Sequence, residues 1–180
     1  MSNLIKVNDL WFEPFINEQA IKQKIQKLAD QINADYAQKE LLILVVLNGS
    51  FLFAADLVRL LNVDLEIDFI RVKSYEGTQS TGKMELLADV KSNIQTKSVL
   101  IIEDIVDTGK TASWLLNYLR SKQAVELEIC SLILKPDALK EPVNIKYVGF
   151  ETSNEFLLGY GLDYDGKGRH LKQIYKQKSI

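Results

Sequence analysis

Apolar residues recur along the chain with two spacings, which predict alternating helices and strands. Over residues 17–39 they recur every three or four positions, as in an amphipathic helix, and Asn17 is a suitable helix cap. Residues 41–47 are apolar without interruption, which predicts a strand buried on both faces. A second helix is predicted over residues 51–61, after a polar break at residues 48–50.

The rest of the chain continues this alternation. Further strands are predicted over residues 65–72, 99–102, 125–134 and 147–150, and a helix over residues 110–120. Strands that alternate with helices indicate a layered α/β fold with a mainly parallel sheet. The chain has no internal repeat and no internal boundary, so we expect one domain over residues 1–180.

Composition narrows the class of protein. Of the 180 residues, 47% are hydrophobic and 26% charged, and the net charge is -2, as expected of a soluble globular domain. The absence of a long basic run argues against a nucleic-acid partner. No apolar run is long enough to span a bilayer, and the first residues lack a signal segment, so we expect no membrane partner and a cytoplasmic location. The single cysteine, Cys130, excludes an internal disulfide and is expected to be a small buried hydrophobe.

The strongest chemical signal follows the apolar strand at residues 99–102. The strand delivers Glu103 and Asp104 to its carboxyl end, and a third acid, Asp107, comes three residues later. The turn before the next predicted helix consists of Thr108, Gly109, Lys110 and Thr111. Ligands of open α/β sheets bind beyond the carboxyl ends of strands, and the free N–H groups of a helix N-terminus suit a phosphate.

The three acids indicate that this site holds more than a phosphate. Carboxylates repel phosphate, whereas a sugar diol or a hydrated magnesium ion favours carboxylate oxygen. A ribose 5-phosphate that bears a metal-bound diphosphate combines all these parts.

Two other interpretations of this segment are weaker. Residues 109–111 resemble the end of a P-loop, but that motif requires a glycine where Asp104 stands. A solvated acidic turn is disfavoured because Ile105 and Val106 interrupt the acids and a phosphate-type turn follows them.

Residues 99–111 resemble the phosphoribosyl diphosphate signature of type I phosphoribosyltransferases. The resemblance extends over nearly the whole chain to the hypoxanthine-guanine branch, through residues 47–50, 74–75, 135–136 and 156–164. It implies the type I phosphoribosyltransferase fold: a mainly parallel twisted sheet flanked by helices, with a small hood formed by chain-terminal segments. It also implies a homo-oligomer, either a dimer or a tetramer.

The resemblance implies roles for the residues of the signature. Glu103 and Asp104 would hold the ribose hydroxyls and the water around Mg2+, which is the expected cofactor. Asp107 would lie near purine N7 as the general base. The 5-phosphate would be bound by Thr108, Gly109, Lys110 and Thr111.

Other residues would bind the purine and the diphosphate. Lys135 would donate to purine O6 and would thereby reject the amino group of adenine. Phe156 would stack on the base, and backbone groups at Leu157 and Asp163 would meet its far edge. The Asp163 side chain would hold a second Mg2+, and Arg169 would contact the diphosphate.

Two further segments complete the implied site. Ser74 and Tyr75 would belong to a lid that closes over it. Asn48 and Gly49 would lie in the diphosphate loop, where the family typically has a cis peptide bond before the middle residue. That middle residue is often lysine in the family, whereas here it is Asn48, so we expect Mg2+ and Arg169 to supply the missing charge.

The implied reaction belongs to purine salvage and uses small-molecule substrates. The 5-phosphoribosyl group of phosphoribosyl diphosphate would pass to N9 of hypoxanthine or guanine, giving IMP or GMP and diphosphate. One alternative is a nucleotide-sensing regulator of the same fold, which the acidic balance, the intact acids and the lack of an added helix-turn-helix segment oppose. Another is a xanthine-preferring transferase, with which the sequence is equally consistent, while Lys135 and Phe156 argue against adenine.

Overall fold

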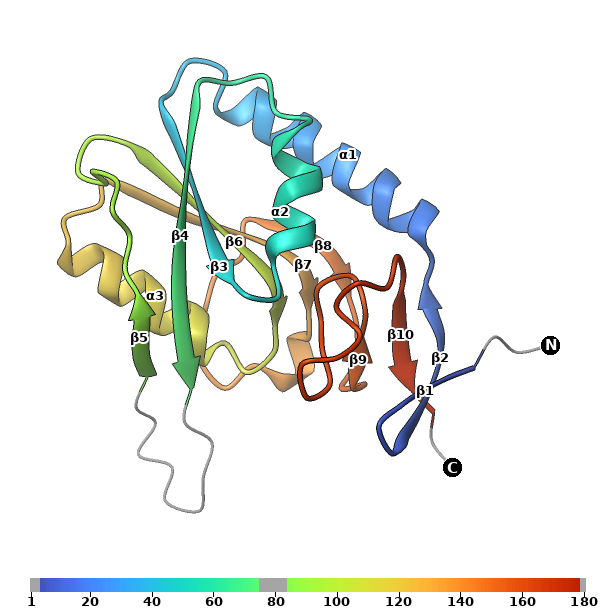
Figure 1. The fold of residues 1–180 in the computed structure, drawn as a ribbon. Helices are drawn as coiled ribbons and strands as arrows, with labels where there is room; N and C mark the ends of the chain where they lie inside the picture. The colour runs from blue at the N-terminus through green and yellow to red at the C-terminus, as the bar shows by residue number, and fades with distance from the viewer. Residues whose placement is uncertain (1–3, 75–83, 179–180) are drawn as a thin grey trace.

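A computed structural model describes residues 4–74 and 84–178 of the chain (Figure 1). The elements follow one another in the order β1 (Ile5–Val7), β2 (Leu10–Ile16), α1 (Glu18–Asp35), β3 (Leu41–Leu47), α2 (Phe51–Val58), β4 (Leu65–Ser74), β5 (Met84–Ala88), β6 (Ser98–Val106), α3 (Lys110–Ser121), β7 (Glu126–Leu134), the short 3-10 helix η1 (Pro136–Ala138), β8 (Tyr147–Glu151), β9 (Leu157–Leu158) and β10 (Ile174–Gln177). These strands form a large sheet and a small one.

The large sheet has its strands in the order β5-β4-β3-β6-β7-β8. The strands from β4 to β8 in this order run parallel, and β5 runs antiparallel to β4. Residues 41–46 of the central strand β3 are all buried, as their uninterrupted apolar run predicts. The expected α/β fold with a mainly parallel sheet is confirmed.

Helices cover both faces of this sheet (Figure 1). α1 and α2 share a core with Ile43 and Val45 on one face, whereas α3 shares a core with Leu42 and Leu44 on the other. Cys130 is fully buried in the first of these cores, as predicted. Among the helices in the described ranges, none is long and apolar enough to cross a membrane.

α1 begins where the sequence predicts and ends early. The Asn17 side chain caps it by accepting a hydrogen bond from the Ala20 N–H at 2.8 Å. The helix ends at Asp35 and not at residue 39. Tyr36 continues the apolar stripe that suggested a longer helix, but its ring is buried just beyond the last turn.

Two other boundaries differ from the prediction by three residues or more. α2 ends at Val58 and not at residue 61, since the backbone continues with tighter hydrogen bonds to carbonyl groups three residues back. β6 runs on to Val106, so Glu103 and Asp104 lie within the strand and not after it. The apolar run that predicts this strand ends at Ile102, whereas the backbone pairing of β6 with β7 continues to Val106.

One edge of the large sheet lacks helical cover. β5 pairs with residues 71–74 at the end of β4. Earlier in β4, Ile67 and Phe69 are 41% and 48% exposed. They pair with Ile43 and Val45, which are buried under α1 and α2, so they lie on the same face of the sheet. The helix layer therefore stops short of this edge.

The small sheet is the hood that the family resemblance implies. Its antiparallel strand order, β1-β2-β10-β9, places segments from near the two ends of the chain side by side (Figure 1). Phe12, Leu158 and Tyr175 form its small separate core. The hydrophobic pattern does not predict this sheet, because β1, β9 and β10 are only two to four residues long.

Candidate active site

The carboxyl ends of two neighbouring strands bring a predicted catalytic residue and a predicted substrate-binding residue together. β6 and β7 pair along their length as far as Val106 and Leu134. The Lys135 N–H then donates to the Val106 carbonyl at 2.9 Å, so the two chains stay adjacent beyond the sheet. Asp107 and Lys135 therefore emerge side by side, at the edge where open α/β sheets bind ligands.

The turn after β6 encloses a cavity of about 240 Å³, lined by Glu103 and residues 105–112. α3 starts within this turn, at Lys110, so the free N–H groups of its first turn border the cavity. The hydroxyls of Thr108 and Thr111 belong to the same lining. This combination of N–H and hydroxyl donors suits a phosphate.

Gly109 shapes this turn. Its φ of 77° favours glycine, and a Cβ at this position would lie 2.9 Å from the Glu141 carbonyl oxygen. The Thr108 carbonyl accepts hydrogen bonds from the N–H groups of Lys140 at 2.9 Å and Glu141 at 3.2 Å. Residues 140–141, which follow η1, thus support the phosphate turn through backbone hydrogen bonds. The sequence alone does not predict this contact.

Lys135 and Asp107 form an ion pair, with 2.7 Å between Lys135 Nζ and Asp107 Oδ2. The lysine side chain is 9% exposed and the carboxylate 47%. A nearly buried ammonium requires a partner because its desolvation is costly, and Asp107 is that partner here. The predicted O6 donor and the predicted general base are therefore in direct contact.

Glu103 and Asp104 point to opposite sides of β6, as consecutive residues of a strand do. Glu103 lines the phosphate cavity, whereas Asp104 faces Gly49. Burial, together with the charge of Asp104, raises the pKa of Glu103 well above its usual value. Burial also raises the pKa of Asp104 to about 6, against the lowering effect of backbone hydrogen bonds. Ionisation of either acid therefore leaves a desolvated charge that a cation would stabilise.

These acids fit a magnesium ion that is shared with a substrate. Mg2+ prefers oxygen ligands and is usually held by one or two carboxylates together with substrate phosphates and water. The charges of Arg169 and Asp163 both act on Asp104, so a second carboxylate lies near it. In the part of the chain that the structure describes, no group of three or more His, Cys, Asp or Glu side chains forms a complete metal site. The donors thus suit a metal that arrives with a diphosphate, and the ligand assignment stays a prediction.

The predicted diphosphate loop follows β3 directly. The Leu47–Asn48 peptide bond is cis, as the family resemblance implies. Asn48 is exposed, and Gly49 lies so close to Asp104 that a Cβ would be 1.7 Å from Asp104 Oδ2. Ser50 is buried, and its hydroxyl donates to a carbonyl of β3, which ties the end of the loop to the sheet.

Arg169 is held by other residues of the hood turn, which contacts this loop. Its Nη1 atom donates to the Gly161 carbonyl at 2.6 Å, and its Nη2 atom pairs with Asp163 Oδ1 at 2.7 Å. A Cβ on Gly161 would lie 2.0 Å from the Gly49 carbonyl oxygen, so the hood turn rests directly on the diphosphate loop. Asp163 Oδ2 also accepts the Gly166 N–H at 2.7 Å, which engages both oxygens of this predicted metal ligand.

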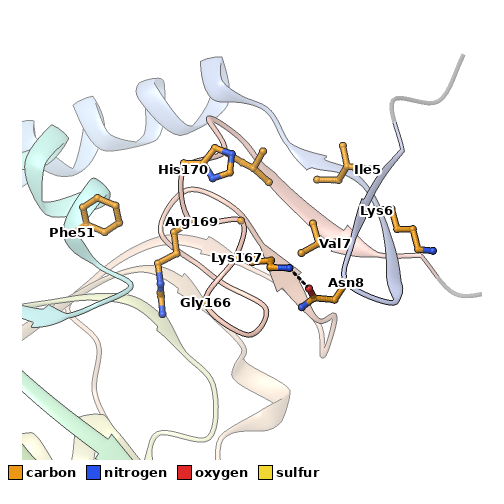
Figure 2. Close-up of a pocket in the computed structure, with 11 residues that line it drawn as sticks. Ile5, Lys6, Val7, Asn8, Phe51, Gly166, Lys167, Arg169 and His170 are labelled. Carbon is orange, nitrogen blue, oxygen red and sulfur yellow. Dashed lines mark hydrogen bonds between the residues drawn. The ribbon is translucent and has the colours of Figure 1, made fainter.

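A larger hollow of about 680 Å³ lies between the hood and the start of α2 (Figure 2). Residues 5–8, Phe51 and residues 166–171 line it. Lys167 Nζ donates to Asn8 Oδ1 at 2.9 Å across this hollow. Figure 2 shows the side chains of Arg169 and His170 leaving the hood in opposite directions.

Phe156 is a partly exposed aromatic residue of the hood. It is 40% exposed and lines a hollow of about 400 Å³. Its ring centroid lies 6.0 Å from that of Phe12 and 5.6 Å, edge-on, from that of Tyr164. The next residue, Leu157, is buried in β9. A partly exposed aromatic ring beside two others suits stacking on a base, and this role stays a prediction.

The structure thus brings most predicted residues into two adjoining groups. The group beside the phosphate cavity contains Glu103, Asp107, Thr108, Gly109, Lys110, Thr111 and Lys135. The group under the hood turn contains Asn48, Gly49, Asp104, Asp163 and Arg169. Ser74 is the last residue of β4, and Tyr75 lies outside the described residues, so the lid stays a prediction.

Tyr160 and Asp56 are absent from the sequence-based site although they connect its parts. The Tyr160 hydroxyl donates to Asp56 Oδ2 at 2.6 Å, which links the hood to α2. A signal for this turn is present in the sequence, since Gly159 and Gly161 flank a tyrosine, and paired glycines mark a close approach of the backbone.

Known proteins resemble this chain over most of its length. The family model described as phosphoribosyl transferase domain matches residues 15–165. A hypoxanthine-guanine phosphoribosyltransferase from Staphylococcus aureus is 40% identical over 168 residues, which cover 93% of this chain and 93% of that protein.

Solved structures agree with this comparison. The crystal structure of a hypoxanthine phosphoribosyltransferase from Staphylococcus aureus has a TM-score of 0.88 at 40% identity, over 92% of this chain and 91% of that chain. The hypoxanthine phosphoribosyltransferase from Trypanosoma cruzi in complex with the product IMP has a TM-score of 0.87 at 33% identity, over 97% of each chain. Together with the phosphate turn and the paired acids of β6, these similarities show that the chain belongs to the phosphoribosyltransferase family, in its hypoxanthine-guanine branch.

Proposed function

We propose that this phosphoribosyltransferase transfers the 5-phosphoribosyl group of phosphoribosyl diphosphate to N9 of hypoxanthine or guanine. The observation that carries the proposal is the 2.7 Å contact of Lys135 Nζ with Asp107 Oδ2 beside the phosphate turn. A 6-oxopurine presents O6 and N7 on one edge. An ammonium beside a carboxylate matches that edge when N7 carries the imidazole proton.

The chemistry follows from these two side chains. The N9 lone pair forms a bond to ribose C1, while the bond from C1 to the diphosphate oxygen breaks and the diphosphate leaves with its electron pair. Positive charge develops on the ribose, by analogy with glycosyl transfer. Asp107 takes the N7 proton as N9 attacks. Lys135 donates to O6, and the amino group of adenine offers no such acceptor.

The remaining predicted residues would bind and orient the phosphoribosyl group. The turn at residues 108–111 would hold the 5-phosphate, and Glu103 and Asp104 would orient the ribose hydroxyls. Arg169 would contact the diphosphate. Bound Mg2+ would neutralise the charge of the departing diphosphate. A lid that contains residues 74–75 would exclude water, which otherwise hydrolyses the activated sugar.

A spectrophotometric assay tests this proposal. The chain is supplied with phosphoribosyl diphosphate and Mg2+ and, in separate arms, with hypoxanthine, guanine, xanthine or adenine. We expect IMP and GMP to form, and no AMP. A faster reaction with xanthine than with either other oxopurine would replace the proposal by its xanthine alternative.

Failure of all oxopurine arms would contradict the transferase assignment itself. The remaining candidate would then be a nucleotide-sensing regulator, which a gel-shift with nucleic acid at stated salt concentration would reveal. The net charge of -2 opposes this outcome.

A homo-oligomer, dimer or tetramer, is the assembly that we propose for this chain in the cytoplasm. Ile67 and Phe69 support it, because two large apolar side chains at an open sheet edge favour contact with a second copy. Light scattering on the eluting protein should give a mass of at least twice 20.5 kDa. The Phe69→Glu variant should shift the distribution toward the monomer.

A further inference from the structure

Two backbone segments of the site touch with no side chain between them. Gly161 has a φ of 99°, and a Cβ there would overlap the Gly49 carbonyl oxygen at 2.0 Å. On the other side, a Cβ on Gly49 would overlap Asp104 Oδ2 at 1.7 Å. The hood turn, the diphosphate loop and the acid of β6 are therefore stacked in direct contact. The hood turn and Asp104 thus leave the loop between them little room to move.

Tyr160 extends from this contact to the helix that follows the loop. Its backbone has a φ of 49°, which an L-residue adopts only where its surroundings require it. The residue is 6% exposed, and its hydroxyl donates to Asp56 Oδ2 at 2.6 Å. Asp56 belongs to α2, which begins directly after Ser50 at the end of the diphosphate loop. One hydrogen bond thus fixes the hood turn to the element that anchors this loop.

The Asp56 carboxylate is already oriented for this bond. Its second oxygen, Oδ1, pairs at 2.5 Å with Nη2 of Arg59, the residue directly after α2. The Arg59 side chain is 73% exposed, so this pair contributes little binding strength and mainly limits rotation of the carboxylate. On the other side, the Tyr160 N–H donates to the Leu171 carbonyl at 2.9 Å, which fixes the backbone that carries the ring.

We propose that Tyr160 and Asp56 are positioning residues that hold the diphosphate loop, residues 48–50, against the hood turn. The inference rests on the proposed function, because it takes this loop to bind the diphosphate. Neither side chain needs to touch a substrate. Their hydrogen bond keeps Gly49 in place between Asp104 on one side and the hood turn that carries Arg169 on the other.

The Tyr160→Phe variant of the full chain tests this role, because it removes the hydroxyl and keeps the ring. Steady-state kinetics with Mg2+ should show KM for phosphoribosyl diphosphate raised by about five- to tenfold, as for loss of one hydrogen bond to a charged group. KM for hypoxanthine should stay within about twofold, since this hydroxyl is bonded to α2 and not to the base side. Asp56→Ala should give the same shift, and the double variant should be no worse than either single one.

Two controls separate positioning from mere stabilisation. Asp56→Asn keeps an oxygen acceptor and should retain the wild-type KM. Tyr147→Phe removes a bond of the same kind and length, from the Tyr147 hydroxyl to Asp35 Oδ2 at 2.6 Å, at the amino end of β8. It should lower the melting temperature without changing either KM.

The wild-type chain could be active while the Tyr160→Phe variant melts at a lower temperature but keeps its KM for phosphoribosyl diphosphate. That result would overturn this inference and leave the proposed function intact. Calorimetric titration with magnesium phosphoribosyl diphosphate gives a second readout that does not depend on turnover. A wild-type chain that neither binds this ligand nor forms nucleotide would overturn both the inference and the proposed function.

Discussion

Lys135 is almost enclosed while its partner Asp107 remains half-exposed, so the two ends of this ion pair have unequal access to a ligand. Under the proposed function, both groups would face one edge of the purine, where Asp107 would take the N7 proton and Lys135 would donate to O6. Recognition of O6 and removal of the N7 proton would then fall to two side chains that already contact each other. This relationship makes the pair a direct target for mutation.

Lys135→Met keeps the length and apolar stem of the side chain and removes its charge. We expect KM for hypoxanthine to rise by about tenfold or more, because a hydrogen bond from a charged donor is lost. The melting temperature should change little, since the carboxylate left behind is 47% exposed and can be hydrated. Initial rates at varied hypoxanthine measure this effect. Unchanged KM values for both substrates would remove Lys135 from base recognition.

Asp107→Asn retains an oxygen that can accept from Lys135 but cannot take a proton. Turnover should fall by about 10²- to 10⁴-fold, the usual contribution of general acid–base catalysis. Affinity for IMP, measured by calorimetry, should remain close to that of the wild type because the contacts are preserved. An undiminished rate would exclude Asp107 as the general base.

Asp104→Asn should stabilise the free protein at neutral pH. Burial raises the pKa of Asp104 from its model-compound value of 3.8 to about 6. The folded state therefore holds this proton more tightly than the unfolded state, and the resulting stability is lost as pH rises between these two values. At about pH 7.5 the Asp104 carboxylate of the wild type is ionised in the folded state. Its partial desolvation lowers the free energy of unfolding by about 1–2 kcal/mol.

Thermal melts in a metal chelator measure this difference. The variant should melt several degrees higher at about pH 7.5, and its advantage should disappear toward about pH 4, where the wild-type acid is protonated. Added magnesium phosphoribosyl diphosphate should stabilise the wild type more than the variant. A variant that is less stable than the wild type at neutral pH would contradict the assignment of a desolvated charge.

Arg169→Met tests how the diphosphate is held when residue 48 is not a lysine. KM for phosphoribosyl diphosphate should rise by about tenfold, and addition of Asn48→Lys should recover part of the loss. Lys167→Met is the matched control, since Lys167 lies two residues away and bonds to Asn8. It should behave as the wild type. Equal losses from both single variants would indicate a general effect of charge and not a specific contact.

The parts of the fold set by local pattern could be predicted, and those set by distant pairing could not. The continuous apolar run of residues 41–47 matches β3, and Asn17 caps α1 as expected. The hydrophobic pattern places the end of β6 at residue 102, because Glu103 breaks the apolar run. The Glu103 backbone nevertheless pairs with Ser131. The signals that the sequence carries are side-chain polarity and spacing, whereas strand length depends on the neighbouring strand.

The same distinction applies to the site. The acids and the phosphate turn lie within one short segment, so their proximity follows from the sequence alone. Asp56 and Tyr160 are separated by 104 positions, and a tyrosine between two glycines says nothing about which carboxylate it will meet. Similarly, Glu103 and Asp104 are consecutive in the sequence, but the side chains of consecutive residues in β6 point to opposite sides of the strand.

The pairing of β2 with β10 also sets an order of events during synthesis. The strands β3 to β8 of the large sheet leave the ribosome before Ile174–Gln177, so the sheet and its phosphate turn can form first. The hood sheet, whose middle position β10 occupies, must wait for that segment. A nascent chain stalled shortly before it would hold the turn after β6 without a complete hood sheet. Among the elements that the structure describes, the hood sheet is therefore the last that can be completed.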